Sequence, residues 1–366
     1  MRLLATVTLN ANQLRAHLLP LVELAEVSEL VLVADEPAPP MPKVRSVVPS
    51  QRQRRMLGRA GSKLVTCTRL ARELRPEWVL SWNVMPHGVN GFVAGRAAGA
   101  RTAYHMIGGE VEWAGGGWRS DNSILGRLPR PLPPLERALL AVVRRTDAVC
   151  TMGTRGRAAL IARGLEEARV HVTPPAVDVE RFSPAAPDAP RAYDLVAVGE
   201  LIPTKRVSDF LEIVARLRER RPALRAAVAG VGPLRAELVA EADRRGVGDA
   251  IDFLGLRADI QELYRSARVF VLTSRYEGLS VAMTEAMASG LPPVVSDVGE
   301  LRDLVEDGRS GFVVGVGDVA AFVDRIGELL DDENRHAEVS AAARDAAVAH
   351  ASVPKVAEIY RRILIG

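Results

Sequence analysis

Two glutamates in the run Ser274–Gly290 are the residues best suited to chemistry. Glu277 stands with Gly278 directly after a strand-like apolar run, and Glu285 follows about two turns into a predicted helix. The first amides of that helix have no partner within it and lie at its positive end, so they can bind an anion such as a diphosphate. Gly278 lets the backbone approach a ligand closely. The Glu285 carboxylate can accept hydroxyl hydrogen bonds from a ribose. Taken alone, the pattern is also explained if Glu277 is a helix-start carboxylate and Glu285 is a surface charge.

The surrounding sequence favours the ligand-binding interpretation. Residues 277–290 resemble the donor-binding motif of glycosyltransferase family 4, in which two glutamates are separated by seven residues. The resemblance covers essentially the whole second half of the chain. Its other segments, in order, are Val198-Gly199 with Lys205, Gly230–Pro233, Asp252–Gly255, Pro292–Glu300 and Glu306–Phe312.

This resemblance implies a GT-B fold, two Rossmann-like domains that face one another, and a donor site without a metal ion or other cofactor. It implies that Glu277 binds hydroxyls of the transferred sugar, that Glu285 binds the ribose and that Lys205 neutralises the leaving diphosphate. The donor is expected to be a UDP- or GDP-sugar. It also implies that Gly199 lies in the donor site and that Leu254 and Gly255 lie beside the base. The amides of Gly278, Leu279, Ser280 and Val281 are expected to hold the distal phosphate.

One residue departs from the family pattern. The family usually has arginine directly after the Val-Gly that ends the first strand of this half, and Glu200 occupies that position. An acidic residue beside a diphosphate is unfavourable. We hypothesise that Arg206, next to Lys205, supplies the missing positive charge.

The first half resembles the family more loosely, as expected for a domain that selects the acceptor. Residues 82–106 are similar to the strand–helix–strand that leads to a family histidine, which implies that His105 lies near the sugar. A buried core histidine is the alternative. Asn12 lies where the family has two glycines, and its amide can contact phosphate or the acceptor.

A glycine-rich segment, Gly108–Arg119, follows His105. Its five glycines and the tryptophans Trp113 and Trp118 predict a mobile lid that stacks on the acceptor. The acceptor expected is a glycan, a lipid-linked sugar or a natural product.

Short apolar runs alternate with helical patterns along the whole chain, which predicts parallel sheets covered on both faces, in a doubly wound α/β fold. Three prolines in Ser183–Pro190 predict a linker between an acceptor-binding domain, 1–184, and a nucleotide-sugar-binding domain, 191–350. An amphipathic helix over 353–366 is expected to pack back on the first domain. In such folds ligands bind outside the carboxyl ends of the strands, so the site is expected where the two domains face each other.

Composition and charge exclude several classes of protein. Hydrophobic residues make up 48% and charged residues 25% of the 366, the balance of a globular protein. A net charge of +3 and few aromatics beside the arginines argue against nucleic-acid binding. Two distant cysteines and the lack of a long apolar run indicate a cytoplasmic protein.

Residues 51–75 predict a basic amphipathic helix. Its basic side can simply face solvent, can rest on an anionic membrane or can hold a phosphorylated acceptor.

The family resemblance also implies the reaction. A hexose-type sugar is expected to be transferred with retention, by departure of the diphosphate and attack of the acceptor on the same face, with diphosphate oxygens as the base. A nucleotide-sugar hydrolase or epimerase of the same fold is the enzymatic alternative. A degenerate sugar-nucleotide-binding module is the other, and Glu200 motivates it.

Overall fold

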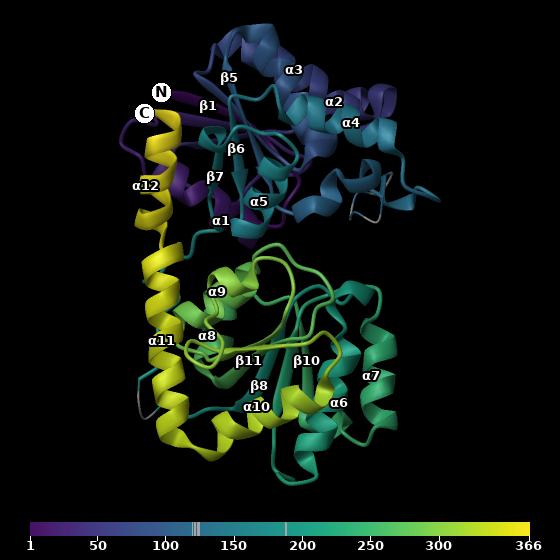
Figure 1. Cartoon of the computed structure of the whole chain (residues 1–366), viewed down its shortest axis with the longest axis vertical. Helices are drawn as coiled ribbons and strands as arrows, with labels where there is room; N and C mark the ends of the chain where they lie inside the picture. The colour runs from purple at the N-terminus through teal and green to yellow at the C-terminus, as the bar shows by residue number, and fades with distance from the viewer. Residues whose placement is uncertain (119, 121, 123–124, 187–188) are drawn as a thin grey trace. The chain divides into compact units, whose positions relative to one another are not determined.

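The computed structural model describes residues 1–118, 120, 122, 125–186 and 189–366. These residues form two compact units (Figure 1). Unit 1 comprises Met1–Ala176 and Val353–Gly366, and unit 2 comprises Val177–Ser352. The division therefore falls before the predicted linker, Ser183–Pro190. Ser183 Oγ accepts a hydrogen bond from Arg265 of unit 2 (2.9 Å), so the start of that segment packs on unit 2. Pro187 and Asp188 lie outside the described residues.

Unit 1 contains a parallel sheet with the strand order β3-β2-β1-β4-β5-β6-β7. Alternate side chains of each strand point to opposite faces, and both faces are apolar, as expected for a sheet covered by helices on both sides. In the described residues its strands are β1 Arg2–Thr6, β2 Glu29–Val33, β3 Val44–Val47, β4 Trp78–Trp82, β5 Arg101–Met106, β6 Ala148–Thr151 and β7 Val170–Val172.

Two layers of helices cover this sheet. Leu3 and Leu80 pack with α1 and α12 on one face, and Leu4 and Val79 pack with α2 and α3 on the other. The C-terminal helix α12 belongs to unit 1, where Trp78 Nε1 donates to the carbonyl of Leu364 (3.1 Å). The helices of the unit are α1 Ala11–Val22, α2 Gln51–Leu74, α3 Val89–Ala98, α4 Pro133–Val143, α5 Thr154–Ala162 and α12 Val353–Leu364.

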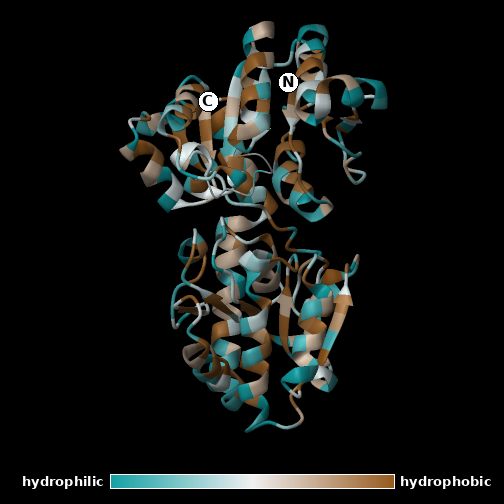
Figure 2. Cartoon of the chain, turned by 90° about the vertical axis from the view of Figure 1, so that its right-hand side faces the viewer, coloured by the Kyte–Doolittle hydropathy of each residue, from teal (hydrophilic) through white to brown (hydrophobic). Residues whose placement is uncertain are grey.

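Unit 2 repeats this plan with the strand order β10-β9-β8-β11-β12-β13, again parallel throughout. Figure 2 shows its strands mostly in brown and its helices with alternating brown and teal faces. Its strands are β8 Tyr193–Val198, β9 Ala226–Ala229, β10 Ile251–Gly255, β11 Ala267–Leu272, β12 Pro293–Ser296 and β13 Phe312–Val314. Its helices are α6 Val207–Arg218, α7 Arg235–Arg244, α8 Ile260–Arg265, α9 Val281–Ala288, α10 Val319–Asp331 and α11 Glu333–Ala351.

The predicted doubly wound parallel fold is confirmed, and the two Rossmann-like units define a GT-B fold. Two short edge strands, β7 and β13, were not expected from the sequence. Each spans three residues, too few to give a readable alternation. No helix in the described part of the chain is both long and apolar enough to cross a membrane.

Candidate donor site

The sheet topology of unit 2 brings the two predicted chemical segments together. Strands β8 and β11 are neighbours, so the loops that follow them lie at the same edge of the sheet. Thr273 Oγ1, directly after β11, donates to the carbonyls of Lys205 and Arg206 (both 3.0 Å). The amide of Arg275 donates to the carbonyl of Thr204 (2.8 Å). These bonds fix the position of Lys205 relative to the segment that carries Glu277.

Lys205 and Glu277 form an ion pair in this site. Lys205 Nζ donates to Glu277 Oε1 at 2.6 Å, and Ser274 Oγ donates to the same oxygen at 2.6 Å. The Lys205 side chain is 24% exposed, whereas that of Glu277 is 9% exposed. An ammonium has three donors, so Lys205 can bind an anion while it keeps Glu277 in place.

The backbone after Glu277 turns directly into α9. The carbonyl of Gly278 accepts from the amide of Glu300 (3.0 Å). The cap of the helix is Ser280, whose Oγ accepts from the amide of Met283 (3.3 Å). The first helical bond runs from Thr284 to the carbonyl of Ser280 (3.0 Å), so the amides of Leu279, Ser280 and Val281 precede it. This is the geometry of an anion site at a helix N-terminus.

Glu285 is a buried carboxylate on α9 and not a surface charge. Its exposed fraction is 6%, and it accepts a long hydrogen bond, 3.4 Å, from the hydroxyl of Tyr264. Burial raises the pKa of Glu285 to about 7, against the opposing charge of Arg181 and the Tyr264 bond. A buried carboxylate with one weak partner is costly for stability alone, and such groups gather at functional sites.

Glycines line the carboxyl ends of the central strands. A side chain at Gly230, whose φ is +148°, would place its Cβ 1.8 Å from the carbonyl oxygen of Gly199. The amide of Gly230 donates to the carbonyl of Gly255 (2.8 Å). Gly199 lies close to Lys205, with an added Cβ 3.7 Å from Lys205 Cε. The glycines therefore bring the ends of β8, β9 and β10 close together.

Arg206 does not take the position that the hypothesis about Glu200 requires. Its guanidinium binds both carboxylate oxygens of Asp209, at 2.7 and 3.0 Å. Arg206 has a φ of +50° and forms the start of α6. Its charge is thus matched within α6, while Glu200 is exposed.

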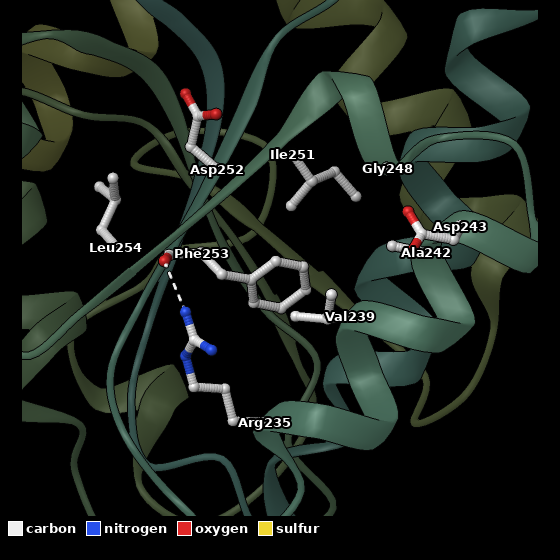
Figure 3. Close-up of a pocket in the computed structure, with 9 residues that line it drawn as sticks. All are labelled: Arg235, Val239, Ala242, Asp243, Gly248, Ile251, Asp252, Phe253 and Leu254. Atoms are coloured by element: carbon white, nitrogen blue, oxygen red, sulfur yellow. Dashed lines mark hydrogen bonds between the residues drawn. The ribbon is translucent and has the colours of Figure 1, made fainter.

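A cavity of about 420 Å³ lies along the edge strand β10 (Figure 3). Phe253 and Val239 face one another across it, and Arg235 of α7 donates to the carbonyl of Phe253 (3.3 Å). Leu254 lines one side of this cavity. Its walls come from α7, β10 and Gly248 in the turn between them, none of which carries Lys205 or Glu277, so it is separate from the ion pair.

The structure corrects the proposed role of His105. The side chain is 2% exposed and lies in the core of unit 1, stacked on Trp82 with a centroid distance of 4.3 Å. His17 and Tyr360 complete this aromatic cluster around Trp82 and His105. Burial lowers the pKa of His105 to about 3. The ring packs among the aromatic side chains of unit 1 and is almost completely enclosed, which favours the core alternative.

The predicted role of Trp113 in an acceptor lid is also wrong. Trp113 is fully buried, with its indole Nε1 donating to Met106 Sδ (3.3 Å) and the Arg163 guanidinium over its ring. Trp118 is half-buried, and Arg119 lies outside the described residues. Asn12 is half-buried in the first turn of α1, which begins with a capping box between Asn10 and Gln13.

Sequence reasoning missed the residue that orders this glycine-rich segment. Glu112, 6% exposed, accepts hydrogen bonds from the Tyr104 hydroxyl (2.6 Å) and the amides of Val84, Ile107 and Gly108 (2.9, 2.8 and 2.6 Å). Burial raises the pKa of Glu112 to about 7, although all four donors oppose that shift. A glutamate among glycines gives no sequence signal of this role.

Comparisons with known proteins agree with the fold. Residues 179–346, which include Lys205, Glu277 and Glu285, match the family model of glycosyl transferases group 1. No group of three His, Cys, Asp or Glu residues suited to a metal ion occurs in the described ranges.

Two curated relatives illustrate the extent of the similarity. The lipopolysaccharide core biosynthesis mannosyltransferase LpsB of Rhizobium meliloti is 32% identical over 216 residues, which is 55% of this chain and 60% of LpsB. The GDP-mannose-dependent alpha-(1-6)-phosphatidylinositol monomannoside mannosyltransferase of Mycolicibacterium smegmatis is 29% identical over 279 residues, 71% of this chain and 68% of that enzyme. The first relatives are matched over about half of their own length.

Solved structures match the whole chain. Anabaena Alr3699/HepE in complex with UDP has a TM-score of 0.76 at 18% identity and covers 100% of this chain and 99% of that one. Sucrose-phosphate synthase from Thermosynechococcus elongatus has the same TM-score at 16% identity, with 99% of each chain covered. At this identity the match establishes the GT-B fold of the two units.

Proposed function

We propose that this protein is a glycosyltransferase that moves a hexose-type sugar from a nucleoside diphosphate to an acceptor. The observation that carries the proposal is the Lys205–Glu277 ion pair beside the N-terminus of α9, with the buried Glu285 on the same helix. The match of residues 179–346 to a glycosyltransferase family supports it.

In this proposal each group of the site has one task. The amides of Gly278 to Val281 and the ammonium of Lys205 bind the diphosphate and stabilise the negative charge that grows as it departs. Glu277, held by hydrogen bonds from Lys205 and Ser274, accepts hydroxyl hydrogen bonds from the sugar. Glu285 accepts hydroxyl hydrogen bonds from the ribose.

We infer that the donor is a UDP- or GDP-sugar and that no metal takes part. HepE was solved with UDP and with UDP-glucose, and the mycolicibacterial relative is named as GDP-mannose-dependent. Lys205 and the helix amides supply the positive potential that a metal ion provides in other transferases. Thermal shift with a panel of UDP-, GDP- and ADP-sugars, repeated with a chelator, tests both parts. A donor that binds only with a divalent ion would contradict the second.

Transfer with retention is part of the proposal. Glu277 is held in the Lys205 ion pair and Glu285 is buried in α9, so we assign neither as a covalent nucleophile. We assign no other carboxylate of the site to that role. Same-face attack, with the leaving diphosphate as base, is therefore the route we favour. A β-linked product from an α-linked donor would contradict it. Nucleotide release that ignores every added acceptor would instead favour a hydrolase, and donor binding without any turnover would favour a binding module.

The acceptor is proposed to be a glycan or a lipid-linked sugar, reached at an anionic membrane surface through residues 51–75. Helix α2 exposes Met56 (72%) and Leu57 (47%) next to the exposed Arg52 and Arg55. Exposed apolar side chains flanked by arginines are typical of a helix that lies at a membrane interface. Sedimentation with vesicles, with and without anionic lipid, tests this contact. The variant Met56→Glu, Leu57→Glu is expected to abolish it.

A further inference from the structure

A polar cluster lies at the carboxyl edge of the unit 1 sheet, outside the donor site. Thr8 follows β1, Asp35 follows β2 and His87 lies in the turn Val84–Gly88 after β4. These three strands are adjacent in the order β2-β1-β4. Between β1 and β4 the strand order reverses direction along the chain, which is where doubly wound sheets bind ligands.

Helix α2 supplies the positive charges of this cluster. Lys63 Nζ donates to Asp35 Oδ2 (2.7 Å) and to Thr8 Oγ1 (2.9 Å). Arg59 donates to Asp35 Oδ2 (2.8 Å), and Arg54 donates to the carbonyl of Asp35. Gly58, with φ +67°, interrupts the helix between these two arginines and lets both reach the same aspartate.

The charged side chains of this cluster are buried, and its own hydrogen bonds leave two polar atoms without a partner. The side chains of Lys63 and Asp35 are 3% and 11% exposed. Among the described residues, Asp35 Oδ1 and Arg54 Nε are buried and have no hydrogen-bond partner. A buried ion pair contributes little to stability, and each unpartnered polar atom costs free energy. Both observations point to a ligand as the missing partner.

The charge of the cluster defines the chemistry of that ligand. His87 is hydrogen-bonded to Thr6 Oγ1 and to Thr8 Oγ1 (3.0 and 3.2 Å), and burial lowers its pKa to about 3, so it is neutral. Three cations and one carboxylate leave a net charge of +2. A phosphate monoester carries about −1.5 to −2 at neutral pH.

We propose that this cluster binds a phosphorylated polyol, with the phosphate on Arg54 and Arg59 and a neighbouring hydroxyl on Asp35 Oδ1. Guanidinium groups bind phosphate oxygens in pairs, and a carboxylate oxygen without a partner accepts a hydroxyl. The inference rests on the proposed function in that the phosphorylated polyol is the part of the acceptor, lipid-linked or free, that this cluster holds. Arg59, with 71% of its side chain exposed, covers the cluster on the solvent side and can move to admit the ligand.

Calorimetric titration of the full chain, saturated with UDP, tests the site. Glycerol 3-phosphate is expected to bind and glycerol is not. Arg59→Gln and Arg54→Gln are each expected to weaken glycerol 3-phosphate binding about tenfold or more, the value of a lost charged hydrogen bond. Arg72→Gln, at an exposed position of the same helix, is the matched control and is expected to stay within about twofold. No binding by the unaltered protein, or equal weakening by all three variants, would overturn the proposal.

Vesicles distinguish a lipid headgroup from a free phosphorylated polyol. If the cluster binds a headgroup, glycerol 3-phosphate releases the protein from phosphatidylcholine vesicles that contain phosphatidic acid, and Arg59→Gln weakens sedimentation. If the ligand is free, glycerol 3-phosphate leaves sedimentation unchanged, and Arg59→Gln weakens it no more than Arg72→Gln does. UDP affinity is measured for every variant in parallel. Failure of UDP binding contradicts the proposed function, whereas failure of glycerol 3-phosphate binding with UDP binding intact contradicts only this inference.

Discussion

Lys205 Nζ lies 2.6 Å from Glu277 Oε1, although the two residues are 72 positions apart in the chain. The contact joins the loop after β8 to the loop after β11, and Thr273 joins the same loops through the carbonyls of Lys205 and Arg206. Glu277 is thereby held in place, while Lys205, the more exposed partner, keeps donors for a ligand. The Lys205–Glu277 ion pair thus joins the group that we assign to the diphosphate to the group that we assign to the sugar.

Replacement of Lys205 by methionine tests the diphosphate half of the site. Methionine keeps the apolar length of the side chain and removes the charge. We expect kcat to fall about 10²- to 10³-fold, the usual cost of one electrostatic group at a developing charge. Steady-state kinetics with the best donor measures this. Lys355→Met, at an exposed lysine of α12, is the control and is expected to be unaltered. A Lys205→Met variant of full activity would refute the assignment.

Glu277→Gln separates binding of the sugar from binding of the nucleotide. The amide keeps an oxygen for Ser274 and loses the charge that Lys205 and the sugar hydroxyls share. Activity is expected to fall about 10²-fold, because hydrogen bonds to a charged group are worth about 1.5–3 kcal/mol each. The affinity for free UDP is expected to stay within about threefold. Calorimetry with UDP and with the UDP-sugar compares the two, and an equal loss for both ligands would contradict the prediction.

The fold and the contact between Lys205 and Glu277 were predictable because they depend on local pattern. Apolar runs between helices indicate a parallel sheet, and β4 spans Trp78–Trp82 as expected. A glutamate and a lysine that follow neighbouring parallel strands must meet at one edge of the sheet. The family resemblance named these residues, and the topology accounts for their contact.

The roles in unit 1 were not predictable, because they depend on burial. His105 precedes the glycine-rich segment and Trp113 lies within it, so both look accessible in sequence, yet both are enclosed by segments distant in the chain. Trp113 packs under Arg163, and His105 packs against Tyr360 of α12. The Asp35–Lys63 pair was missed for the same reason. In the sequence Lys63 is one of many basic residues, and its contact with Asp35 depends on how α2 packs on β1 and β2.

Glu285 predicts a pH dependence of both stability and donor affinity. Its folded pKa of about 7 lies above the ordinary value of 4.5, so its stabilising contribution is complete below pH 4.5 and is lost as the pH rises through about 7. Glu285→Gln removes that loss, and we expect the variant to gain about 3 kcal/mol relative to the unaltered protein at pH 8.

Donor affinity behaves in the opposite way, because the ionised form of Glu285 accepts the ribose hydroxyls. UDP affinity is expected to fall as the pH drops from 8 to 6, and to be weak and independent of pH in Glu285→Gln. A UDP affinity that is unchanged across this range would contradict the assignment.

Glu112 predicts that unit 1 depends on a single buried carboxylate. Glu112→Ala leaves three amides and the Tyr104 hydroxyl with a lost acceptor in the core. Each buried group left unsatisfied costs about 1–3 kcal/mol, so we expect a loss of at least 3 kcal/mol in the free energy of unfolding. Glu110→Ala, two residues earlier and half-exposed, serves as the control with less than 0.5 kcal/mol expected, approximately the effect of a surface substitution. Denaturant unfolding followed by tryptophan fluorescence measures both variants.

Three buried histidines predict that unit 1 loses stability in acid. Burial lowers the pKa of His17 to about 4 and of His87 and His105 to about 3, below the ordinary 6.5. A lowered pKa means that the stabilising contribution is complete above pH 6.5 and is lost as the pH falls toward 4, by about 1.4 kcal/mol per pH unit for each histidine.

His105→Phe separates this effect from the opposite contribution of Glu112 and Glu285. Phenylalanine keeps the stack on Trp82 and cannot be protonated, so the variant is expected to lose less stability between pH 6.5 and 5 than the unaltered protein, by about 1.4 kcal/mol per pH unit. Its transferase activity at pH 7.5 is expected to stay within about threefold, because the ring is enclosed in the core. A loss of activity of about 10²-fold with unchanged thermal stability would restore His105 to the site, since a group that acts on the substrate affects turnover and not folding.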